Sequence, residues 1–411
     1  MALIVKKFGG SSVATAAKIL AVAQRVLGDK APDDKVVVVV SAMGDTTDDL
    51  ISLAKSVTDK PYGREMDMLL ATGEQVSIAL LAMTFARLGQ PSVSLTGFQA
   101  GITTSDAFGK AKITNIKPER VLTELAAGKI VVVAGFQGLT PAGDITTLGR
   151  GGSDTTAVAL AGALKADICE IYTDVDGVYS ADPRVVKAAR RMREITYNEM
   201  LEMARLGAVV MQPRSVEMGK HYNVPIHVRS TFSQEPGTII REVYTMEEKE
   251  FVIRGVTHDA NVVKVAILGV PDRPGIAYKV FSALAKANID VDMIVQSIRN
   301  ADKKINDIVF TIAKPELPLA RTIIEDIGKE MGVLGVVVDE NVAKVSVVGA
   351  GMYGSPGIAA SMFGALADAG INIEVISTSE ISISCLIQAD QVKEAVNAIH
   401  SHFFKNGNTG K

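Results

Sequence analysis

The chain has 411 residues, of which 47% are hydrophobic and 22% are charged, and its formal net charge is −3. This composition is typical of a soluble globular protein of two or three domains and excludes a disordered chain. The charge gives no electrostatic reason to expect nucleic acid or an anionic membrane as a partner. The two cysteines, Cys169 and Cys385, lie in separate apolar runs, so we expect buried reduced thiols in a cytoplasmic protein. We expect neither a signal peptide nor a transmembrane helix.

The N-terminal segment predicts a strand, a glycine turn and a helix. Residues 3–5 are apolar, Lys7, Gly9 and Gly10 follow, and apolar residues from position 13 onward recur at helical spacing. Backbone amides of such a turn can hold a phosphate, with the Lys7 ammonium beside them. The residue order is not that of a P-loop. A strand, turn and helix without a special function is the alternative interpretation.

Two further segments carry polar side chains at informative positions. Residues 35–40 form a β-branched run, which is typical of a central parallel strand. Ser41 and Thr47 follow it, where open α/β sheets bind their ligands. A long helix, expected at about 65–88, contains Glu74 in a mainly apolar stretch. This carboxylate is therefore either partly buried with a partner or faces solvent.

Residues 146–156 form the central pattern of the sequence, one that is typical of an anion-binding site. Two adjacent glycines allow close approach of a ligand to the backbone, and Arg150 suits a carboxylate or a phosphate. Ser153 or Asp154 can cap the helix that follows, whose free amides and dipole favour anions. An ordinary glycine turn before a capped helix is the alternative.

Strands and helices alternate along the first part of the chain. Strands are expected at 92–95, 129–135, 168–173 and 224–229, and helices at about 155–164, 197–206 and 214–222. This alternation predicts an α/β fold, a mainly parallel sheet between two helical layers. The polar residues at the ends of the strands lie on the edge that such folds use for ligands.

Five segments, at 7–12, 40–44, 72–74, 148–154 and 172–179, resemble in their order the signature segments of aspartate kinases, a branch of the amino-acid kinase family. The resemblance covers about 1–240. It implies a three-layer α/β/α amino-acid kinase domain at 1–245, with a linker at 241–250. The implied activity is a phosphotransferase with a carboxyl acceptor, which converts ATP and L-aspartate to ADP and 4-phospho-L-aspartate. This is the first step of lysine, threonine and methionine biosynthesis.

The resemblance also implies roles for individual residues. Lys7 is expected at the transferred phosphoryl group, with Asp154 orienting it as the second catalytic residue. The expected substrate-binding residues are Thr47, Glu74, Arg150 and Ser153. The expected ATP-binding residues are Lys7, Gly9, Gly10, Ser41, Thr173, Asp174, Tyr179 and Arg184. Mg²⁺ is expected to bridge the ATP phosphates, without a metal site of the protein itself. The substrate carboxylate is ionised at pH 7, so no general base is required.

The C-terminal part contains an internal repeat. Residues 274–276 recur at 356–358, and several other positions match at the same offset of 82, which implies a duplicated unit. Each unit predicts a ferredoxin-like βαββαβ pattern, the first at 261–341 and the second at 342–411. The second unit lacks a final strand, and we predict that the strand pattern at 251–257 completes its sheet.

Each repeated unit resembles an ACT domain, a small-molecule sensor of amino-acid biosynthetic enzymes. This resemblance implies feedback inhibition by lysine, threonine or both. The effector-binding residues are expected to be Asp272, Ile289, Gln296, Asn372 and Ile373. It further implies a homo-oligomer formed through the ACT domains, and Met246 is a candidate start of a shorter ACT-only subunit.

Three alternatives stay open at this point. The ACT domains could serve dimerisation alone. The kinase could be another member of the same fold, acting on glutamate, carbamate or a nucleotide. The chain could also be a catalytically inactive amino-acid sensor.

Overall fold

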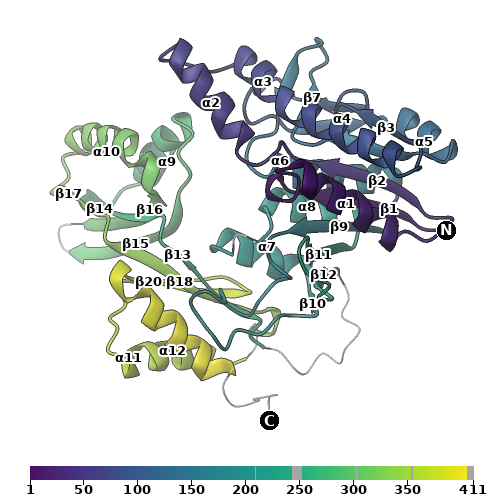
Figure 1. Cartoon of the computed structure of the whole chain (residues 1–411). Coiled ribbons are helices and arrows are strands. Elements are labelled where there is room, and N and C mark those ends of the chain that lie inside the picture. The colour runs from purple at the N-terminus through teal and green to yellow at the C-terminus, as the bar shows by residue number, and fades with distance from the viewer. Residues whose placement is uncertain (209, 243–251, 301–303, 353–354, 405–411) are drawn as a thin grey trace. The chain divides into compact units, whose positions relative to one another are not determined.

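The computed structural model describes residues 1–208, 210–242, 252–300, 304–352 and 355–404 (Figure 1). The chain divides into two compact units, which are described separately. Unit 1 comprises Met1–Val178, Arg191–Ala204 and Val209–Met246, and unit 2 comprises Tyr179–Arg190, Arg205–Ala208 and Glu247–Lys411. Two short segments of the predicted kinase domain therefore pack with the C-terminal unit.

Unit 1 is built on an eight-stranded sheet in the order β10-β12-β11-β9-β1-β2-β6-β3. Its strands are β1 (Leu3–Phe8), β2 (Lys35–Val40), β3 (Ser92–Leu95), β6 (Ile130–Ala134), β9 (Ile168–Thr173), β10 (Glu194–Ile195), β11 (Ile226–Ser230) and β12 (Thr238–Ile240). All neighbours are parallel except β11 and β12. The predicted mainly parallel sheet is thus confirmed. β1 lies at its centre, so the turn after β1 is flanked by the ends of β2 and β9.

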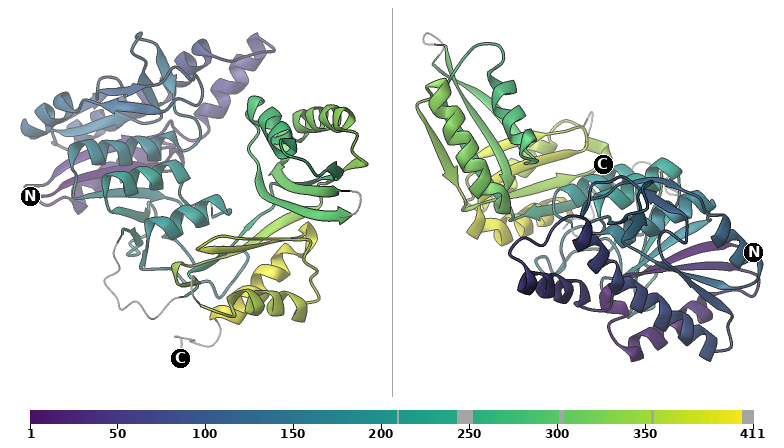
Figure 2. Two further views of the ribbon diagram at one scale, coloured as in Figure 1. Left: turned by 180° about the vertical axis from the view of Figure 1, so that it is seen from behind. Right: turned by 90° about the horizontal axis from the view of Figure 1, so that it is seen from above.

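Helices cover both faces of this sheet (Figure 2). The helices of unit 1 are α1 (Ala16–Asp29), α2 (Thr46–Val57), α3 (Arg64–Leu70), α4 (Thr72–Arg87), α5 (Glu119–Ala126), α6 (Gly152–Leu164), α7 (Tyr197–Arg205) and α8 (Pro213–Tyr222). Apolar residues of α1 and α4 share one core cluster with Phe8 of β1 and with alternate residues of β2 and β6. Helix α6 contacts β1, β2 and β9 and packs against α8. A sheet with a layer of helices on each face is the predicted three-layer α/β/α architecture.

A second, smaller sheet of unit 1 lies outside the sequence-based expectations. Its order is β5-β4-β7-β8, with β4 at Ile102–Thr104, β5 at Ile113–Ile116, β7 at Gln137–Leu139 and β8 at Ile145–Thr147. These strands have three or four residues each and no run of β-branched apolar side chains, so their local signal is weak. Strand β8 leads directly into the segment that contains Arg150.

One helical stretch in the described part of the chain, Arg64–Arg87, is long and apolar enough to cross a membrane by length and composition alone. It carries the buried carboxylates Asp67 and Glu74. Its second part, α4, packs against β3 and β6. This is the behaviour of a core helix, and it does not indicate a membrane protein. Both cysteine thiols are buried and free, as predicted.

Unit 2 contains two four-stranded antiparallel sheets, in the orders β15-β16-β14-β17 and β13-β18-β20-β19. The elements of the first are β14 (Val262–Pro271), α9 (Ile276–Lys286), β15 (Asp292–Asn300), β16 (Ile305–Ala313), α10 (Leu317–Met331) and β17 (Gly335–Asp339). The elements of the second are β13 (Gly255–Asp259), β18 (Val342–Val348), α11 (Ile358–Asp368), β19 (Val375–Thr378), β20 (Ser382–Gln388) and α12 (Val392–Phe404). β13 pairs with β18 and occupies the place that β17 has in the first sheet.

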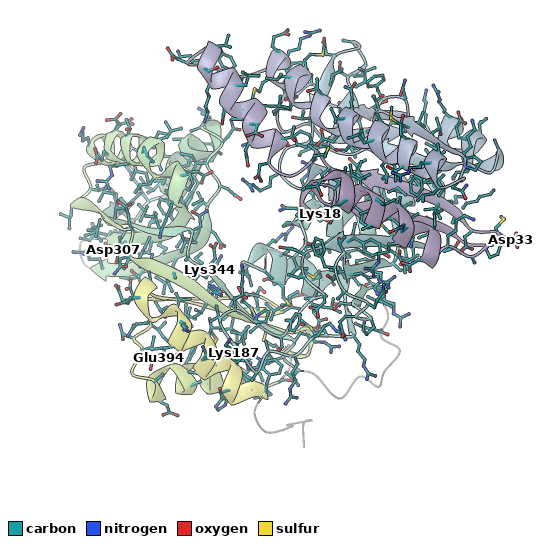
Figure 3. All side chains as sticks on the ribbon, viewed as in Figure 1. Lys18, Asp33, Lys187, Asp307, Lys344 and Glu394 are labelled. Atoms are coloured by element: carbon teal, nitrogen blue, oxygen red, sulfur yellow. The ribbon has the colours of Figure 1, made fainter. Side chains whose placement is uncertain are left out.

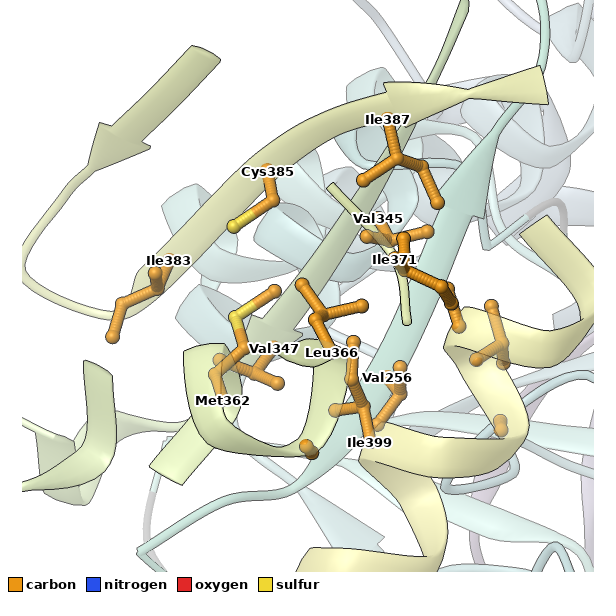
Figure 4. Close-up of a cluster of buried hydrophobic side chains, with 14 of the residues drawn as sticks. Val256, Val345, Val347, Met362, Leu366, Ile371, Ile383, Cys385, Ile387 and Ile399 are labelled. Carbon is orange, nitrogen blue, oxygen red and sulfur yellow. The ribbon is translucent and has the colours of Figure 1, made fainter. Parts of the chain in front are cut away.

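The second sheet has an apolar core (Figure 4). Residues from the predicted kinase domain also belong to this core. Side chains of β13, β18, β20, α11 and α12 form this core, and Ala181 and Val186 of the segment Tyr179–Arg190 belong to it. Polar contacts hold the same segment: the Ser180 hydroxyl and the His400 imidazole are 2.9 Å apart. This tertiary packing explains why the segment clusters with unit 2.

The two four-stranded sheets of unit 2 are joined by a pair of reciprocal contacts. Lys344 of β18 (labelled in Figure 3) lies 2.5 Å from a carboxylate oxygen of Asp292 on β15. Lys264, the equivalent third residue of β14, pairs with Glu374. A small apolar cluster that includes Met293 and residues of the second sheet lies alongside these pairs. The duplication is therefore visible in the contacts as well as in the sequence.

Candidate active site

The end of β1 brings a lysine against the first turn of α6. Successive strand residues face opposite sides of the sheet, so Lys7 faces α6 while Lys6 faces α1. The Lys7 Nζ atom lies 2.6 Å from Oδ1 of Asp154, and Lys7 is only 9% exposed. The two residues predicted as the catalytic pair are thus in direct contact.

The glycines after β1 permit close packing of two loops. A Cβ atom at Gly10 would lie 2.8 Å from the carbonyl oxygen of Ala42, so a side chain is excluded there. The Gly44 amide donates to the Gly10 carbonyl, and the Ser41 amide donates to the Phe8 carbonyl. The loops that follow β1 and β2 are therefore linked, and they bring Gly9, Gly10 and Ser41 near Lys7.

Helix α6 begins earlier than the sequence predicts. Its N-cap is Gly151, in the left-handed region with φ of 70°, and no side chain caps it. Ser153 and Asp154 lie inside the first turn, so the prediction that one of them caps the helix is wrong. The reason is the glycine pair, which turns the chain into the helix before a capping side chain is reached. Acidic side chains such as Asp154 are favoured in a first helical turn by the helix dipole.

Glu74 is buried at the start of α4. It is 3% exposed, and its Oε1 atom accepts a hydrogen bond of 3.2 Å from the Ala42 amide. Its Oε2 atom has no hydrogen-bond partner among the described residues. Burial raises the pKa of Glu74 to about 7. The sequence left open whether Glu74 is buried or exposed, and the structure shows that it is buried. Its Oε2 atom is available to a cationic group.

This burial has a consequence for stability that can be measured. The carboxyl pKa rises from 4.5 to about 7 on folding, so the folded state holds its proton more tightly than the unfolded state. Stability contributed by the protonated form is then lost as the pH rises from about 4.5 to about 7. Glu74→Gln is expected to increase the free energy of unfolding by about 3 kcal/mol at pH 8 and by little at pH 4. Urea unfolding of both proteins at the two pH values measures this, and equal differences at both would contradict it.

Two predicted substrate residues lie at the surface of the same sheet edge. Thr47 is in the first turn of α2 and is partly exposed. Arg150 lies between β8 and α6 and is exposed, without an ion-pair partner among the described residues. Ser153 is 7% exposed, and a Cβ atom at Gly135 would lie 2.7 Å from its hydroxyl.

The predicted nucleotide residues divide between the two units. Thr173 ends β9, beside β1, and its hydroxyl donates to the exposed Asp174 carboxylate at 2.9 Å. Tyr179 and Arg184 belong to the segment of unit 2 described above. The Arg184 guanidinium lies 2.8 Å from an oxygen of Asp182. A role of Tyr179 and Arg184 in nucleotide binding stays a prediction.

Comparison with known proteins agrees with this arrangement. A profile of the amino acid kinase family matches residues 2–230, and ACT domain profiles match residues 264–329 and 345–403. The chain is 50% identical to an aspartokinase of Mycolicibacterium smegmatis, over 99% of this chain and 97% of that protein. It is 49% identical to an aspartokinase of Bacillus sp. strain MGA3, over 100% and 99%. The chain belongs to the aspartokinases.

Solved structures of aspartokinases share the fold. Escherichia coli aspartokinase III in complex with aspartate and ADP has a TM-score of 0.82 and 26% identity, and the match covers 98% of this chain and all of that one. Aspartate kinase from Synechocystis is 48% identical with a TM-score of 0.55, over 98% of this chain and 69% of that one. The predicted resemblance is confirmed, and this aspartokinase is a phosphotransferase with a carboxyl acceptor that carries two ACT domains.

The predicted effector residues of the aspartokinase lie at strand ends and edges of the ACT sheets. Gln296 on β15 and Asn372 before β19 are exposed, and β15 and β19 contact each other. Asp272 is exposed, and its amide donates to the Lys304 carbonyl. Two apolar residues complete the set: Ile289, which is 6% exposed, and Ile373, which is partly buried. Helices α9 and α11 begin directly after Gly275 and Gly357.

Sequence reasoning missed three polar residues around the segment that contains Arg150, two of them buried and one partly buried. These are Asp67 on α3, Gln137 on β7 and Arg214 on α8, all of which bond to backbone groups far along the chain. A carboxylate inside the apolar helix α3 was a usable signal for Asp67, of the same kind as that for Glu74. The partners of Asp67 could not be predicted, because they include backbone amides and the sequence does not show which amides a side chain will contact.

Proposed function

We propose that this aspartokinase transfers the terminal phosphoryl group of ATP to the side-chain carboxylate of L-aspartate, as the first step of lysine, threonine and methionine biosynthesis. The observation that carries the proposal is the buried Glu74 carboxylate with one unpaired oxygen. A buried carboxylate requires a cationic or donor partner, and the α-ammonium of an amino acid is such a partner. The exposed Arg150 would hold the α-carboxylate of the same molecule, with Thr47 and Ser153 completing the pocket.

Lys7 would stabilise the phosphoryl group in transfer. Phosphoryl transfer depends on positioning and on neutralising negative charge rather than on covalent chemistry. The ion pair with Asp154 holds the Lys7 ammonium at a fixed place. The amides of Gly9 and Gly10 would hold phosphate oxygens beside it, with Ser41 nearby. Because the attacking carboxylate is ionised at pH 7, we assign no residue as a general base.

The nucleotide would be held by Thr173 and Asp174 at the end of β9, and by Tyr179 and Arg184. In the described residues, no group of three or more His, Cys, Asp and Glu side chains is arranged to hold a metal ion. We therefore assign Mg²⁺ to the ATP phosphates, whose hard oxygen atoms it prefers. Escherichia coli aspartokinase III was solved with aspartate and ADP, which supports these two ligands here.

A hydroxylamine trap tests the proposed reaction. An acyl phosphate reacts with hydroxylamine to give a hydroxamate, so L-aspartate with ATP and Mg²⁺ is expected to give β-aspartyl hydroxamate in step with ADP. Glutamate and carbamate are expected to give neither product. Turnover of either in place of aspartate would identify another member of the fold, and no turnover with any of them would favour an inactive sensor.

We also propose that the ACT domains bind lysine, threonine or both as feedback inhibitors. Escherichia coli aspartokinase III has been solved with lysine and aspartate in a T-state, with a TM-score of 0.77 and 26% identity to this chain. Ligand binding can inhibit only if it favours one arrangement of the protein over another. Gln296, Asn372 and Asp272 are the exposed polar side chains that we assign to amino-acid recognition.

Replacing Gln296 by alanine is expected to weaken inhibition by at least one effector about 5- to 150-fold, which corresponds to a typical coupling energy of 1–3 kcal/mol. Uninhibited activity should change little, because Gln296 and Lys7 belong to different units. Inhibition curves with lysine, threonine and the pair measure the effect, with Gln391→Ala as the matched control. If Gln296→Ala and Asp272→Ala both kept full sensitivity to every amino acid tested, the ACT domains would serve dimerisation alone.

We further propose a cytoplasmic homo-oligomer that associates through its ACT domains, without nucleic-acid or membrane partners. Several large apolar side chains of the ACT strands are exposed, among them Ile294 and Ile298 on β15 and Ile376 on β19. Exposed apolar side chains in one region favour a protein interface. Native mass spectrometry measures the oligomer. Met246 lies outside the described residues, and a shorter subunit starting there would be detected in the same experiment.

A further inference from the structure

The chain between β8 and α6 carries Arg150 and leads to Ser153 and Asp154. Two glycines surround Arg150 with positive φ, Gly149 at 75° and Gly151 at 70°. Such a segment has little conformational preference of its own. The position of Arg150 therefore depends on contacts of the residues that flank the two glycines, which on the N-terminal side are Thr147 and Leu148.

All four polar backbone atoms of Thr147 and Leu148 are bonded to other elements. The Thr147 amide donates to Oδ2 of Asp67 at 2.8 Å, and the Thr147 carbonyl accepts from the Ala111 amide at 3.0 Å. The Leu148 amide donates to the Phe136 carbonyl at 2.8 Å. The Leu148 carbonyl accepts from the Arg214 guanidinium at 2.7 Å. These two residues are thus held from several sides at once.

Asp67 makes one of these four backbone contacts and also bonds to the Thr147 side chain. It is 1% exposed, and its carboxylate accepts three hydrogen bonds. Two come from Thr147, through the amide and the hydroxyl, both at 2.8 Å, and the third comes from the Gly109 amide at 2.9 Å. Hydrogen bonds to a charged group are the strong ones, so the loss of the carboxylate removes three strong contacts at once.

Asp67 also connects the two halves of the proposed substrate pocket. It lies on α3, which ends three residues later and continues through Ala71 into α4, where Glu74 is buried. The Gln137 side-chain amide, on the strand paired with Thr147, donates to the Ala71 carbonyl at 2.9 Å. The Ala71 carbonyl and the Asp67 carboxylate therefore connect the helix of Glu74 to the segment of Arg150 at two points.

We propose that Asp67 is a positioning residue for aspartate binding. It touches neither substrate nor nucleotide, and it sets the separation between Arg150, which would hold the α-carboxylate, and Glu74, which would hold the α-ammonium. This inference rests on the proposed function. It predicts that the loss of Asp67 affects aspartate more than ATP, because Lys7 and the glycine turn after β1 make no contact with it.

Three variants test the inference. Asp67→Ala leaves the Thr147 and Gly109 amides unpaired, and the KM for aspartate is expected to rise about 10- to 100-fold, as for a displaced binding group, with the KM for ATP within twofold. Asp67→Asn is expected to stay near the unaltered protein, because its carbonyl oxygen can accept from both amides while its NH₂ donates to the Thr147 hydroxyl. Thr147→Val removes one bond of the three and is expected to give an intermediate KM for aspartate.

The outcomes are distinct. An unchanged aspartate KM in Asp67→Ala overturns the inference, and so does an equal rise in Asp67→Asn, which would assign a direct role to the charge. If Asp67→Ala does not fold, Thr147→Val decides alone, and an unchanged aspartate KM in that variant overturns the inference. Asp34→Ala is the matched control, since Asp34 also accepts two backbone amides, from Ala2 and Ala31.

A second readout separates this inference from the proposed function. Hydrogen exchange of the peptide covering residues 145–152 should be faster in Asp67→Ala and unchanged in Asp67→Asn, whatever the substrate. Absence of hydroxamate from the unaltered protein would refute the proposed function. Unchanged exchange in Asp67→Ala would refute the positioning role itself.

Discussion

Lys7→Ala is expected to lower kcat about 10²- to 10³-fold while the fold stays intact. The ammonium would stabilise charge that develops on the transferred phosphoryl group, and the loss of one such preorganised group has an effect of this size. Because the interaction strengthens in the transition state, kcat and kcat/KM for ATP should fall together. Steady-state kinetics measures kcat and kcat/KM, and circular dichroism shows whether the fold is intact.

The matched control for this change is Lys129→Ala. Lys129 also pairs with a carboxylate, Glu124, at 2.7 Å, but it precedes β6 at the opposite edge of the parallel sheet. Its replacement should leave kcat within twofold. Near-normal turnover in Lys7→Ala would remove Lys7 from the mechanism, and Asp154 would lose its proposed role in orienting it.

Glu74→Gln is expected to raise the KM for aspartate about 30- to 4,000-fold with a smaller change in the KM for ATP. Removing one member of a buried, hydrogen-bonded charge pair costs about 2–5 kcal/mol, and here the other member would be the substrate ammonium. Glutamine keeps the size of the side chain and can still accept from the Ala42 amide. The change therefore tests charge rather than packing.

The same residue predicts a pH dependence. Since the pKa of Glu74 is about 7 in the free protein, protonation below that pH removes the partner of the ammonium, and kcat/KM for aspartate should fall as the pH decreases through about 7. This inflection should be absent in Glu74→Gln. Glu65→Gln, at an exposed carboxylate of α3, is the control. A Glu74→Gln variant with a changed KM for ATP and an unchanged KM for aspartate would contradict the assignment of Glu74.

The sequence by itself determined most elements of the large sheet of unit 1 and of the two sheets of unit 2, with their order. β-branched runs such as residues 35–40, glycines after strands and apolar residues at helical spacing are local signals, and they predicted the parallel sheet and its helices. The repeat at an offset of 82 predicted two similar sheets in the same way. The signature segments also identified the family, because each is a short local pattern whose order along the chain is visible in the sequence.

Only the tertiary structure decided features that depend on partners distant in the chain. Glu74 is buried because α4 packs closely on Ala42, and a Cβ at Gly73 would lie 2.9 Å from that side chain. Asp67 meets Thr147 across 80 positions, through backbone atoms that every residue has. No local pattern distinguishes such amides from others.

The assignment of chain segments to the two units was decided in the same way. Ala181 and Val186 follow a kinase strand in the sequence, yet they pack in the core of the second ACT sheet. β13 also pairs with β18 of the second ACT unit, but this pairing was a prediction from the sequence, because that unit lacks a final strand of its own. Burial of apolar surface depends on the surface available after folding and not on neighbourhood in the sequence, so the packing of Ala181 and Val186 required the folded chain.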